Sequence, residues 1–276
     1  MSILSYLKIT RPFNGVMSMI AVYIAALVAG VVSLSNLVPS LQLVFAMLAT
    51  FFISSFGMVF NDIFDIEIDK INKPKRPLPS GKISLKVANI YGVLLAIVGL
   101  AFAYFVNFYA FGVAIVATVL LYAYAAKLKK VMLVGNIVVS FLVGLTFIYG
   151  GVINFNFLGV IMLAFLAFLA NMAREIYKTC EDVVGDKKEG VRSLAIKYGV
   201  VRAKMAGSVF IILAVILSIV PFIIRLFGLP YLIVVTVADL VFLMAVFSDI
   251  NTSAKMVKLG MNLALLAFLL GALIVI

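Results

Sequence analysis

The chain has 276 residues, of which 66% are hydrophobic and only 12% are charged, and its mean hydropathy is +1.27. This composition excludes an ordinary soluble globular protein and indicates a polytopic membrane protein. The formal net charge of +11 is typical of a basic collar on a membrane bundle, so we expect no nucleic-acid partner.

Apolar runs of about 20 residues recur along the whole chain and predict transmembrane helices. We expect nine, at roughly residues 13–33, 41–61, 88–106, 109–126, 133–153, 157–175, 205–224, 230–248 and 257–276. The predicted fold class is all-α, with one intramembrane domain over residues 1–276. The first apolar run is too long for a signal peptide and should be retained as the first helix.

Basic residues define the predicted topology. Of the 22 Lys and Arg residues, all except Arg225 fall on one side of the nine predicted helices. The positive-inside rule then places the N-terminus and every long loop in the cytoplasm, and the C-terminus outside, for a multi-pass protein of the cell membrane.

The first predicted helix opens with Pro12 in its first turn, where the missing N–H costs nothing. Asn14 follows, just inside the apolar run. A polar residue at this depth forms either a hydrogen bond between helices or a contact with substrate.

A first acidic cluster ends the second predicted helix. Acids are scarce in this chain, with only eleven in total. No break precedes Asn61, so we expect the same helix to continue to Asp69, with Asn61, Asp62, Asp65 and Asp69 on one face and Glu67 pointing elsewhere. Carboxylates stacked at this spacing repel one another and favour a bound cation.

A basic loop follows that cluster. Pro74, Pro77, Pro79 and Gly81 exclude a long helix, and Ser80 or Ser84 can cap the next one. The six Lys and Arg residues from Lys70 to Lys86 outnumber the four facing acids. We therefore favour a lid over an anionic substrate, although the cations could simply pair with the acids.

The segment between the fourth and fifth helices contains Tyr124 and Lys129, followed by Gly135-Asn136. Its aromatic and basic residues could anchor the chain at the membrane interface or line a cytoplasmic pocket, and composition alone does not separate these alternatives.

A second polar face ends the sixth predicted helix. A helical projection turns Glu181 away from the other polar residues. Those that share one face are Asn171, Glu175, Lys178, Thr179, Asp182 and Asp186. Polar residues recurring along a membrane helix face the bundle interior. Asp239 is an isolated acid in the eighth predicted helix, where we expect a polar neighbour rather than direct chemistry.

These features together favour a ligand that is anionic, metal-bound and partly lipophilic, such as a diphosphate ester with a hydrocarbon tail. The chain has no histidine and one cysteine, Cys180, so a metal site has to use oxygen ligands, which favours Mg²⁺. We expect Mg²⁺ ions held by Asp65 with Asp69, and by Asp182 with Asp186, to bridge the diphosphate. Lys and Arg would supply further positive charge.

Two motifs resemble those of the UbiA-type intramembrane prenyltransferases. The first is Asn61-Asp62-x-x-Asp65-x-x-x-Asp69-x-x-Asn72-x-Pro74-x-Arg76-Pro77-Leu78-Pro79-Ser80-Gly81, and the second is Arg174-Glu175-Ile-Tyr-Lys178-x-x-Glu181-Asp182-x-x-Gly185-Asp186. The resemblance implies nine helices around a central cavity with cytoplasmic cap loops. It also implies Mg²⁺-dependent ionisation of an allylic diphosphate and attack by an acceptor at C1.

The resemblance also implies roles for individual residues. Metal or diphosphate ligands would be Asn61, Asp65, Asp69, Asp182 and Asp186, with Asp62 behind them. Phosphate oxygens would be steadied by Arg76, Lys129, Arg174 and Lys178, whereas Asn14 and Tyr124 would touch the acceptor or the carbocation. Thr179 stands where family members often carry an acid, so a metal role there is not expected.

Within the family, the motifs look most like the branch that makes archaeal ether lipids, which joins geranylgeranyl diphosphate to the hydroxyl of geranylgeranylglyceryl phosphate. A phosphorylated prenyl-glycerol acceptor would suit the surplus of cations. The alternatives are prenylation of an aromatic quinone precursor, the heme and chlorophyll branches, and a transporter or binder of lipid phosphates without chemistry. Transport is disfavoured because the charges gather at one membrane interface.

Overall fold

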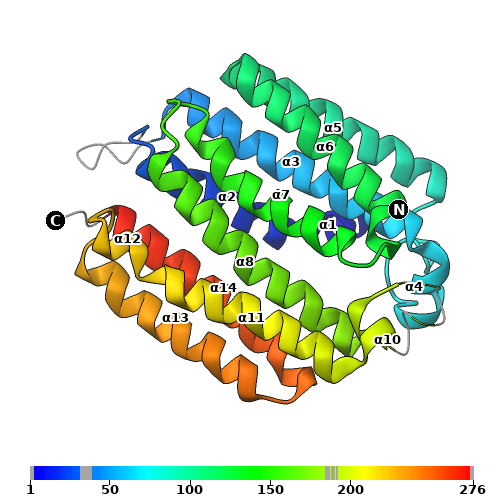
Figure 1. Ribbon diagram of the computed structural model, residues 1–276. Helices are drawn as coiled ribbons and strands as arrows, with labels where there is room; N and C mark the ends of the chain where they lie inside the picture. The colour runs from blue at the N-terminus through cyan, green and yellow to red at the C-terminus, as the bar shows by residue number, and fades with distance from the viewer. Residues whose placement is uncertain (1–2, 32–38, 184–186, 188–189, 191, 274–276) are drawn as a thin grey trace.

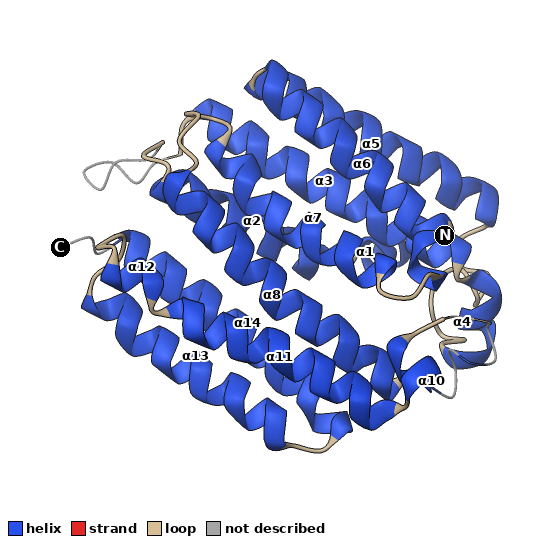
Figure 2. Cartoon of the chain, in the orientation of Figure 1, coloured by secondary structure: helices blue, strands red, loops and turns tan. Residues whose placement is uncertain are grey.

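The computed structural model describes residues 3–31, 39–183, 187, 190 and 192–273. Over these ranges every regular element is a helix and no strand occurs (Figure 2). The elements are α1 (Ile3–Thr10), α2 (Pro12–Val28), α3 (Leu41–Phe64), α4 (Ile66–Asn72), α5 (Leu85–Val106), α6 (Phe108–Ala126), the 3₁₀ helix η1 (Leu128–Lys130), α7 (Val134–Gly151), α8 (Leu158–Glu181), α10 (Leu194–Tyr198), α11 (Val200–Ser218), α12 (Val220–Ile223), α13 (Leu229–Phe247) and α14 (Ile250–Leu273).

The predicted all-α membrane fold is confirmed. Eight helices of the described chain are long and apolar enough to cross a membrane, and there are nine if the bent pair α1 and α2 forms one span. The bend of 51° falls at Arg11, whose φ of 48° is left-handed. Pro12 begins α2, as the sequence predicts.

Several helices extend beyond their predicted ends. The helix α8 continues to Glu181 and α14 begins at Ile250, several residues outside the predicted spans. Hydropathy marks only the part of a helix that lies in hydrocarbon, so polar turns at the ends escape it. The extra turns of α8 carry Lys178 and Glu181 of the site.

The helices run side by side as one bundle, with α1, α4 and α10 gathered at the same end (Figure 1). The start of α1 and the end of α14 lie at opposite ends of that bundle (Figure 1). Small residues bring α2 and α7 together, since a Cβ on Gly150 would lie 2.6 Å from the carbonyl oxygen of Val22. Such close approach is typical of membrane helix pairs.

The basic loop after α4 is folded onto the bundle. Leu78 and Ile83 are buried and pack in one apolar cluster with Phe56 and Phe60 of α3. The hydroxyl of Ser84 accepts a hydrogen bond of 3.3 Å from the backbone N–H of Val87 and caps α5. The predicted non-helical loop and its cap are therefore confirmed.

The acidic segment is not one continuous helix, and that prediction is wrong. The helix α3 ends at Phe64, α4 begins at Ile66, and Asp65 lies between them with φ −94° and ψ 7°. Backbone hydrogen bonds continue on either side, from Asp65 N to Asn61 O at 3.0 Å and from Asp69 N to Asp65 O at 2.8 Å. The residues thus stay near one face. The helix breaks where a tertiary partner, Arg76, holds the acids of both pieces, an attraction that local periodicity does not reveal.

Candidate functional site

Two cavities of different chemistry meet inside the bundle. One has a volume of about 430 Å³ and charged walls, and the other, of about 560 Å³, is mostly apolar. Five residues line both: Arg11, Asn61, Tyr124, Glu175 and Lys178. We call these five residues the rim. A ligand with a charged head and an apolar tail would cross it.

The polar cavity brings the two acidic clusters of the sequence together. Asp65 and Asp69 line it from the end of α3 and from α4, and Asp182 lines it from the end of α8. Its basic lining residues are Arg11, Lys73, Arg76, Lys129, Lys130 and Lys178. The site therefore combines carboxylates with a comparable number of cations.

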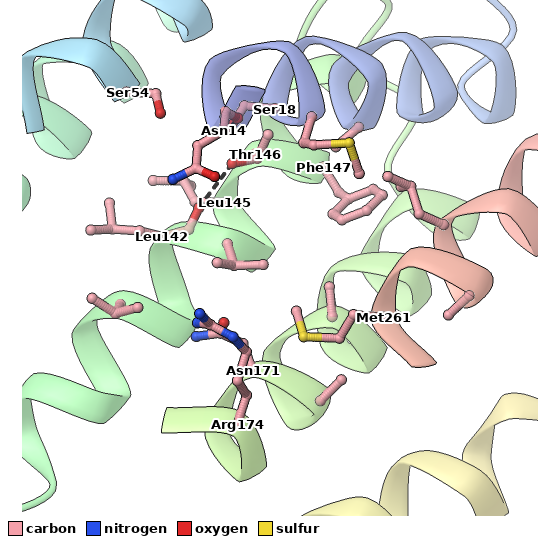
Figure 3. Close-up of a pocket in the computed structure, with 18 of the residues that line it drawn as sticks. Asn14, Ser18, Ser54, Leu142, Leu145, Thr146, Phe147, Asn171, Arg174 and Met261 are labelled. Atoms are coloured by element: carbon pink, nitrogen blue, oxygen red, sulfur yellow. Dashed lines mark hydrogen bonds between the residues drawn. The ribbon is translucent and has the colours of Figure 1, made fainter. Parts of the chain in front are cut away.

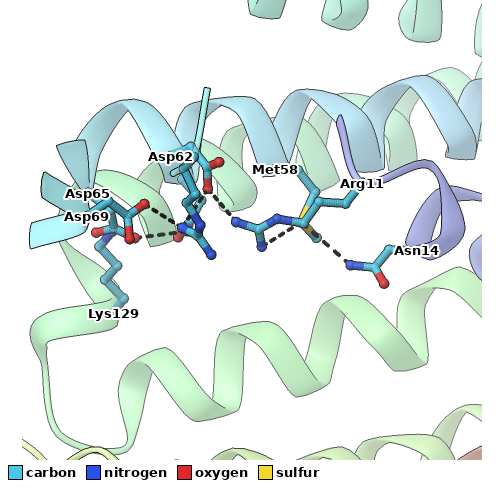
Figure 4. A network of polar contacts seen from close by, with 9 residues as sticks. Arg11, Asn14, Met58, Asp62, Asp65, Asp69 and Lys129 are labelled. Atoms are coloured by element: carbon cyan, nitrogen blue, oxygen red, sulfur yellow. Dashed lines mark hydrogen bonds and ion pairs between the residues drawn. The ribbon is translucent and has the colours of Figure 1, made fainter. Parts of the chain in front are cut away.

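Asp62 anchors a charge network behind this cavity (Figure 4). Its carboxylate is 3% exposed and accepts hydrogen bonds on Oδ1 from Arg11 and, at 3.1 Å, from Arg76. The same guanidinium nitrogen of Arg76 also donates to Asp69. Asp62 lines neither cavity, so its position suits it to hold the two guanidinium groups in place.

Lys129 holds Asp65 from the other side of the polar cavity. Its ammonium donates to Asp65 Oδ1, and the Asn61 side chain donates to Asp65 Oδ2 at 2.9 Å. Lys129 belongs to η1, which passes directly over the start of α7: a Cβ on Gly135 would lie 2.9 Å from the Lys129 Cα. Glycine is required there, because any larger residue would move η1.

The end of α8 supplies the opposite wall. Glu175 accepts a hydrogen bond of 2.6 Å from Arg174, and the Thr179 hydroxyl donates to the carbonyl of Ile176 at 2.8 Å. Glu181 also lines the polar cavity, which corrects the projection that turned it away. Glu181 is the last residue of α8, and the backbone leaves the regular helical path at the next residue, Asp182 (φ −92°, ψ 7°). Asp186 lies outside the described residues.

The apolar cavity lies between α2, α3, α6, α7, α8, α13 and α14. Figure 3 shows lining residues from α2, α3, α7, α8 and α14. Its walls include Leu142, Phe147 and Phe268. Phe13 lines it although 62% of that residue is exposed, so the cavity reaches the molecular surface beside the start of α2.

Polar residues of the apolar cavity are mostly paired with protein groups. The Asn14 amide lies 3.8 Å from the sulfur of Met58, and Asn171 donates to Ser140 Oγ at 3.1 Å. Asp239 accepts a hydrogen bond of 2.7 Å from Ser218, so its predicted polar neighbour is present. Asn14 thus faces the cavity from α2 while contacting a side chain of α3.

The donor atoms of the polar cavity fit a hard divalent cation. Asp65, Asp69, Asp182 and Asn61 offer only oxygen ligands of the kind that Mg²⁺ prefers. Among the described residues no three acids, cysteines or histidines lie close enough to hold a metal by themselves. A metal here would therefore be bound by one or two carboxylates with further oxygens from a ligand, the usual arrangement for Mg²⁺ on phosphates.

The sequence alone assigned no role to some residues that the structure places at the site. Arg11 joins the rim because the bend between α1 and α2 turns it towards Asp62. Lys258 and Asn262 line the apolar cavity from α14. Their spacing of four residues on one helix was the available signal.

Comparison with known proteins gives consistent matches along the chain. Residues 18–274 match the UbiA prenyltransferase family. The chain is 39% identical to digeranylgeranylglyceryl phosphate synthase of Methanocaldococcus jannaschii, covering 97% of this chain and 96% of the relative. The relative of that name in Methanosphaera stadtmanae is 35% identical, with 97% and 99% covered.

Solved structures agree with these matches. A structure described as giving insight into digeranylgeranylglyceryl phosphate synthase in membranes is 39% identical, has a TM-score of 0.81 and covers 98% of each chain. A UbiA homolog from Archaeoglobus fulgidus bound to GPP and Mg²⁺ is 20% identical, with a TM-score of 0.76 and 98% and 99% covered. The second likeness supports the fold alone.

Proposed function

Because this chain belongs to the UbiA prenyltransferase family and is a membrane prenyltransferase, we propose that it makes an ether lipid in its paired cavities. The donor is geranylgeranyl diphosphate, and the acceptor is the free hydroxyl of geranylgeranylglyceryl phosphate. The product is digeranylgeranylglyceryl phosphate, in agreement with the name carried by relatives that are 35–42% identical.

The junction of the two cavities carries this proposal. A prenyl diphosphate has a charged head and an apolar tail, and the polar and apolar cavities match these parts in order. The carbon that reacts joins head to tail, so it would lie at the rim. Burying the tail removes apolar surface from water and contributes about 25 cal/mol for each Å².

Positive groups of the polar cavity would bind the diphosphate. Lys129 and Arg76 each form an ion pair with an acid of the first cluster, so both are held in place before a ligand binds. Lys178 lines both cavities from α8 and can contact the head where it meets the tail. Ordered cations of this kind stabilise the charge that develops on a departing diphosphate.

Acids of the same cavity would hold Mg²⁺. We propose Asp65, Asp69 and Asn61 for one ion and Asp182 for the other, with Asp186 beside it as the motif implies. When bound, Mg²⁺ would neutralise the diphosphate oxygens and favour their departure. The apolar walls would orient the hydrocarbon tail and exclude water.

The acceptor hydroxyl would approach from the apolar cavity. The bond between C1 and the diphosphate oxygen breaks, the acceptor oxygen bonds to C1, and the hydroxyl proton leaves to a phosphate oxygen or water. Asn14 faces the apolar cavity and Tyr124 belongs to the rim, which suits them to position the acceptor. Placing both reactants in one cavity removes much of the entropic cost of their encounter.

We propose a cytoplasmic active site. Cations gather at the end of the bundle that holds α1, α4 and α10 (Figure 1), and the positive-inside rule assigns that end to the cytoplasm. Water-soluble diphosphate released from the polar cavity would then enter the cytoplasm.

A competition assay tests the proposed reaction. Purified protein in lipid vesicles receives Mg²⁺, geranylgeranyl diphosphate, and equal amounts of geranylgeranylglyceryl phosphate and hydroxybenzoate, and the products are identified by mass. We expect the doubly prenylated glycerol phosphate. A prenylated hydroxybenzoate would instead assign the chain to quinone synthesis, and the absence of both products would contradict this choice of donor and acceptors.

A further inference from the structure

Lys258 is a charged residue of the apolar cavity to which the scheme above gives no role. It lies on α14 and lines the cavity together with Met261 and Asn262. Its side chain is exposed, so it stands where the cavity opens. No ion pair of the described residues includes it, whereas Arg11 and Arg174 in the same cavity pair with acids.

The packing of α8 against α14 places Lys258 level with Lys178. The helices are antiparallel: Tyr177 shares an apolar cluster with Val257, and Leu163 shares another with Ala272. At the charged end, Glu181 and Lys255 lie close enough for their charges to interact. Lys178 lies three residues from Glu181 towards the middle of α8, and Lys258 lies three residues from Lys255 towards the middle of α14. Each step is a rise of about 4.5 Å, so the two lysines lie at a similar depth.

The two lysines therefore converge on one space. Both line the apolar cavity, and Arg174 and Asn262 follow at the next matched level. Neither lysine forms an ion pair among the described residues. Glu181 offsets part of the Lys178 charge at the end of α8. Two cations beside an apolar space nevertheless repel each other, and an anion placed between them would relieve that repulsion.

A phosphate monoester on a lipid suits this space. It carries about −1.5 to −2 charge at neutral pH and offers three acceptor oxygens. The walls beyond Lys258 are apolar, with Met261, Leu265 and Phe268 continuing along α14, so a hydrocarbon tail attached to the phosphate would be covered. A diphosphate head is better served by the polar cavity, which Lys258 does not line.

We propose that Lys258, with Lys178 opposite and Asn262 deeper on the same helix face, binds the phosphate of the acceptor lipid. This inference rests on the proposed function and adds to it a recognition site separate from the diphosphate subsite around Arg76 and Lys129. Lys258 selects a phosphorylated acceptor, and Lys178 lies between the two anions.

Steady-state kinetics of Lys258→Gln test this assignment. We expect the KM for geranylgeranylglyceryl phosphate to rise roughly tenfold, because one charge-assisted contact is lost, while the KM for geranylgeranyl diphosphate stays unchanged. Lys255→Gln is the matched control, since Lys255 lies on the same helix but lines neither cavity, and it should behave as wild type. Lys258→Arg should retain a low acceptor KM. Lys258→Met replaces the glutamine variant if that protein does not fold.

A binding measurement without donor separates this proposal from the reaction itself. Wild-type protein in vesicles should bind the phosphorylated prenyl glycerol more tightly than its dephosphorylated alcohol, and Lys258→Gln should lose that preference. Inorganic phosphate at the same concentration should displace little of the lipid, because it has no tail to bury. Equal displacement would mean a site for free phosphate and would overturn the proposal.

The kinetic outcomes separate the two ideas. An unchanged acceptor KM, or an equal rise in both KM values, would contradict the role of Lys258 while leaving the proposed reaction intact. If wild-type protein forms no product but keeps a Lys258-dependent preference for the phosphorylated lipid, the reaction is wrong and the phosphate site stands.

Discussion

The guanidinium of Arg76 lies 3.1 Å from the Asp62 carboxylate and donates to Asp69 through the same nitrogen. Arg76 comes from the basic loop, whereas Asp62 is in α3 and Asp69 in α4. One side chain thus joins both pieces of the broken acidic helix to the loop above them. Asp62 is almost fully buried and lines neither cavity, which indicates a positioning role.

Asp62→Asn should weaken both the fold and the reaction. The substitution leaves Arg11 without its carboxylate partner and Arg76 with one instead of two. Loss of one partner of a buried ion pair costs about 3 kcal/mol, so the thermal midpoint in detergent should fall by several degrees. Glu67→Gln is the control, because Glu67 pairs only with Lys70 at the surface. Equal thermal midpoints for both variants would show that Asp62 does not contribute to the stability of the fold.

Asp65→Asn should abolish most of the Mg²⁺-dependent release of diphosphate. Asp65 lines the polar cavity and its carboxylate is held by Lys129 and Asn61. We expect a loss of at least about 100-fold, because loss of a group that only orients a metal ligand already costs about 10- to 100-fold. Glu67→Gln should release diphosphate at the wild-type rate, since its side chain is 78% exposed on the other face. Similar losses in both variants would refute the assignment of one functional face.

Gly135→Ala should reduce activity while the catalytic side chains remain intact. The added Cβ would lie 2.9 Å from the Lys129 backbone, and η1 would have to move. A shift of about 1 Å in a binding group can cost 100-fold in rate. Gly112→Ala in α6 is the control, because a Cβ there meets nothing within 4 Å and alanine favours helix. Turnover measured with saturating substrates should separate the two variants.

Cysteine labelling should report the orientation in the membrane. Cys180 is buried and should not react with an impermeant maleimide. We expect Asn154→Cys, between α7 and α8, to be labelled from outside intact cells, and Lys73→Cys, in the basic loop, to be labelled only after the membrane is opened. The reverse pattern would place the active site outside.

The helices and most site residues follow from local chemistry in the sequence. Apolar runs predict the spans, and i, i+4 spacing predicts that Asp65, Asp69 and Asp182 face inwards, as the structure has them in the polar cavity. The break at Asp65 was not predicted, because the i, i+4 spacing of the acids continues across it and the contact of Arg76 with the acids of both helices is tertiary. The projection turned Glu181 away, but this residue is the last of α8 and lines the polar cavity beside Asp182.

Contacts across the bundle were the least predictable part. Arg11 reaches Asp62 only because the chain bends by 51° at a left-handed residue. Lys258 stands at the start of the ninth predicted helix, residues 257–276, but α14 begins earlier, at Ile250, and places it in the cavity wall. Both positions depend on how helices pack, which no spacing within one helix encodes.

The two products, diphosphate and the doubly prenylated lipid, lie on opposite sides of the rim and leave by different routes. Diphosphate leaves the polar cavity into water, whereas the doubly prenylated lipid occupies a cavity that reaches the surface beside Phe13 at the start of α2. In the proposed orientation that opening faces the inner leaflet, so every new lipid molecule is delivered to one side of the bilayer. Balanced growth of the membrane then depends on a separate step that moves lipids across it.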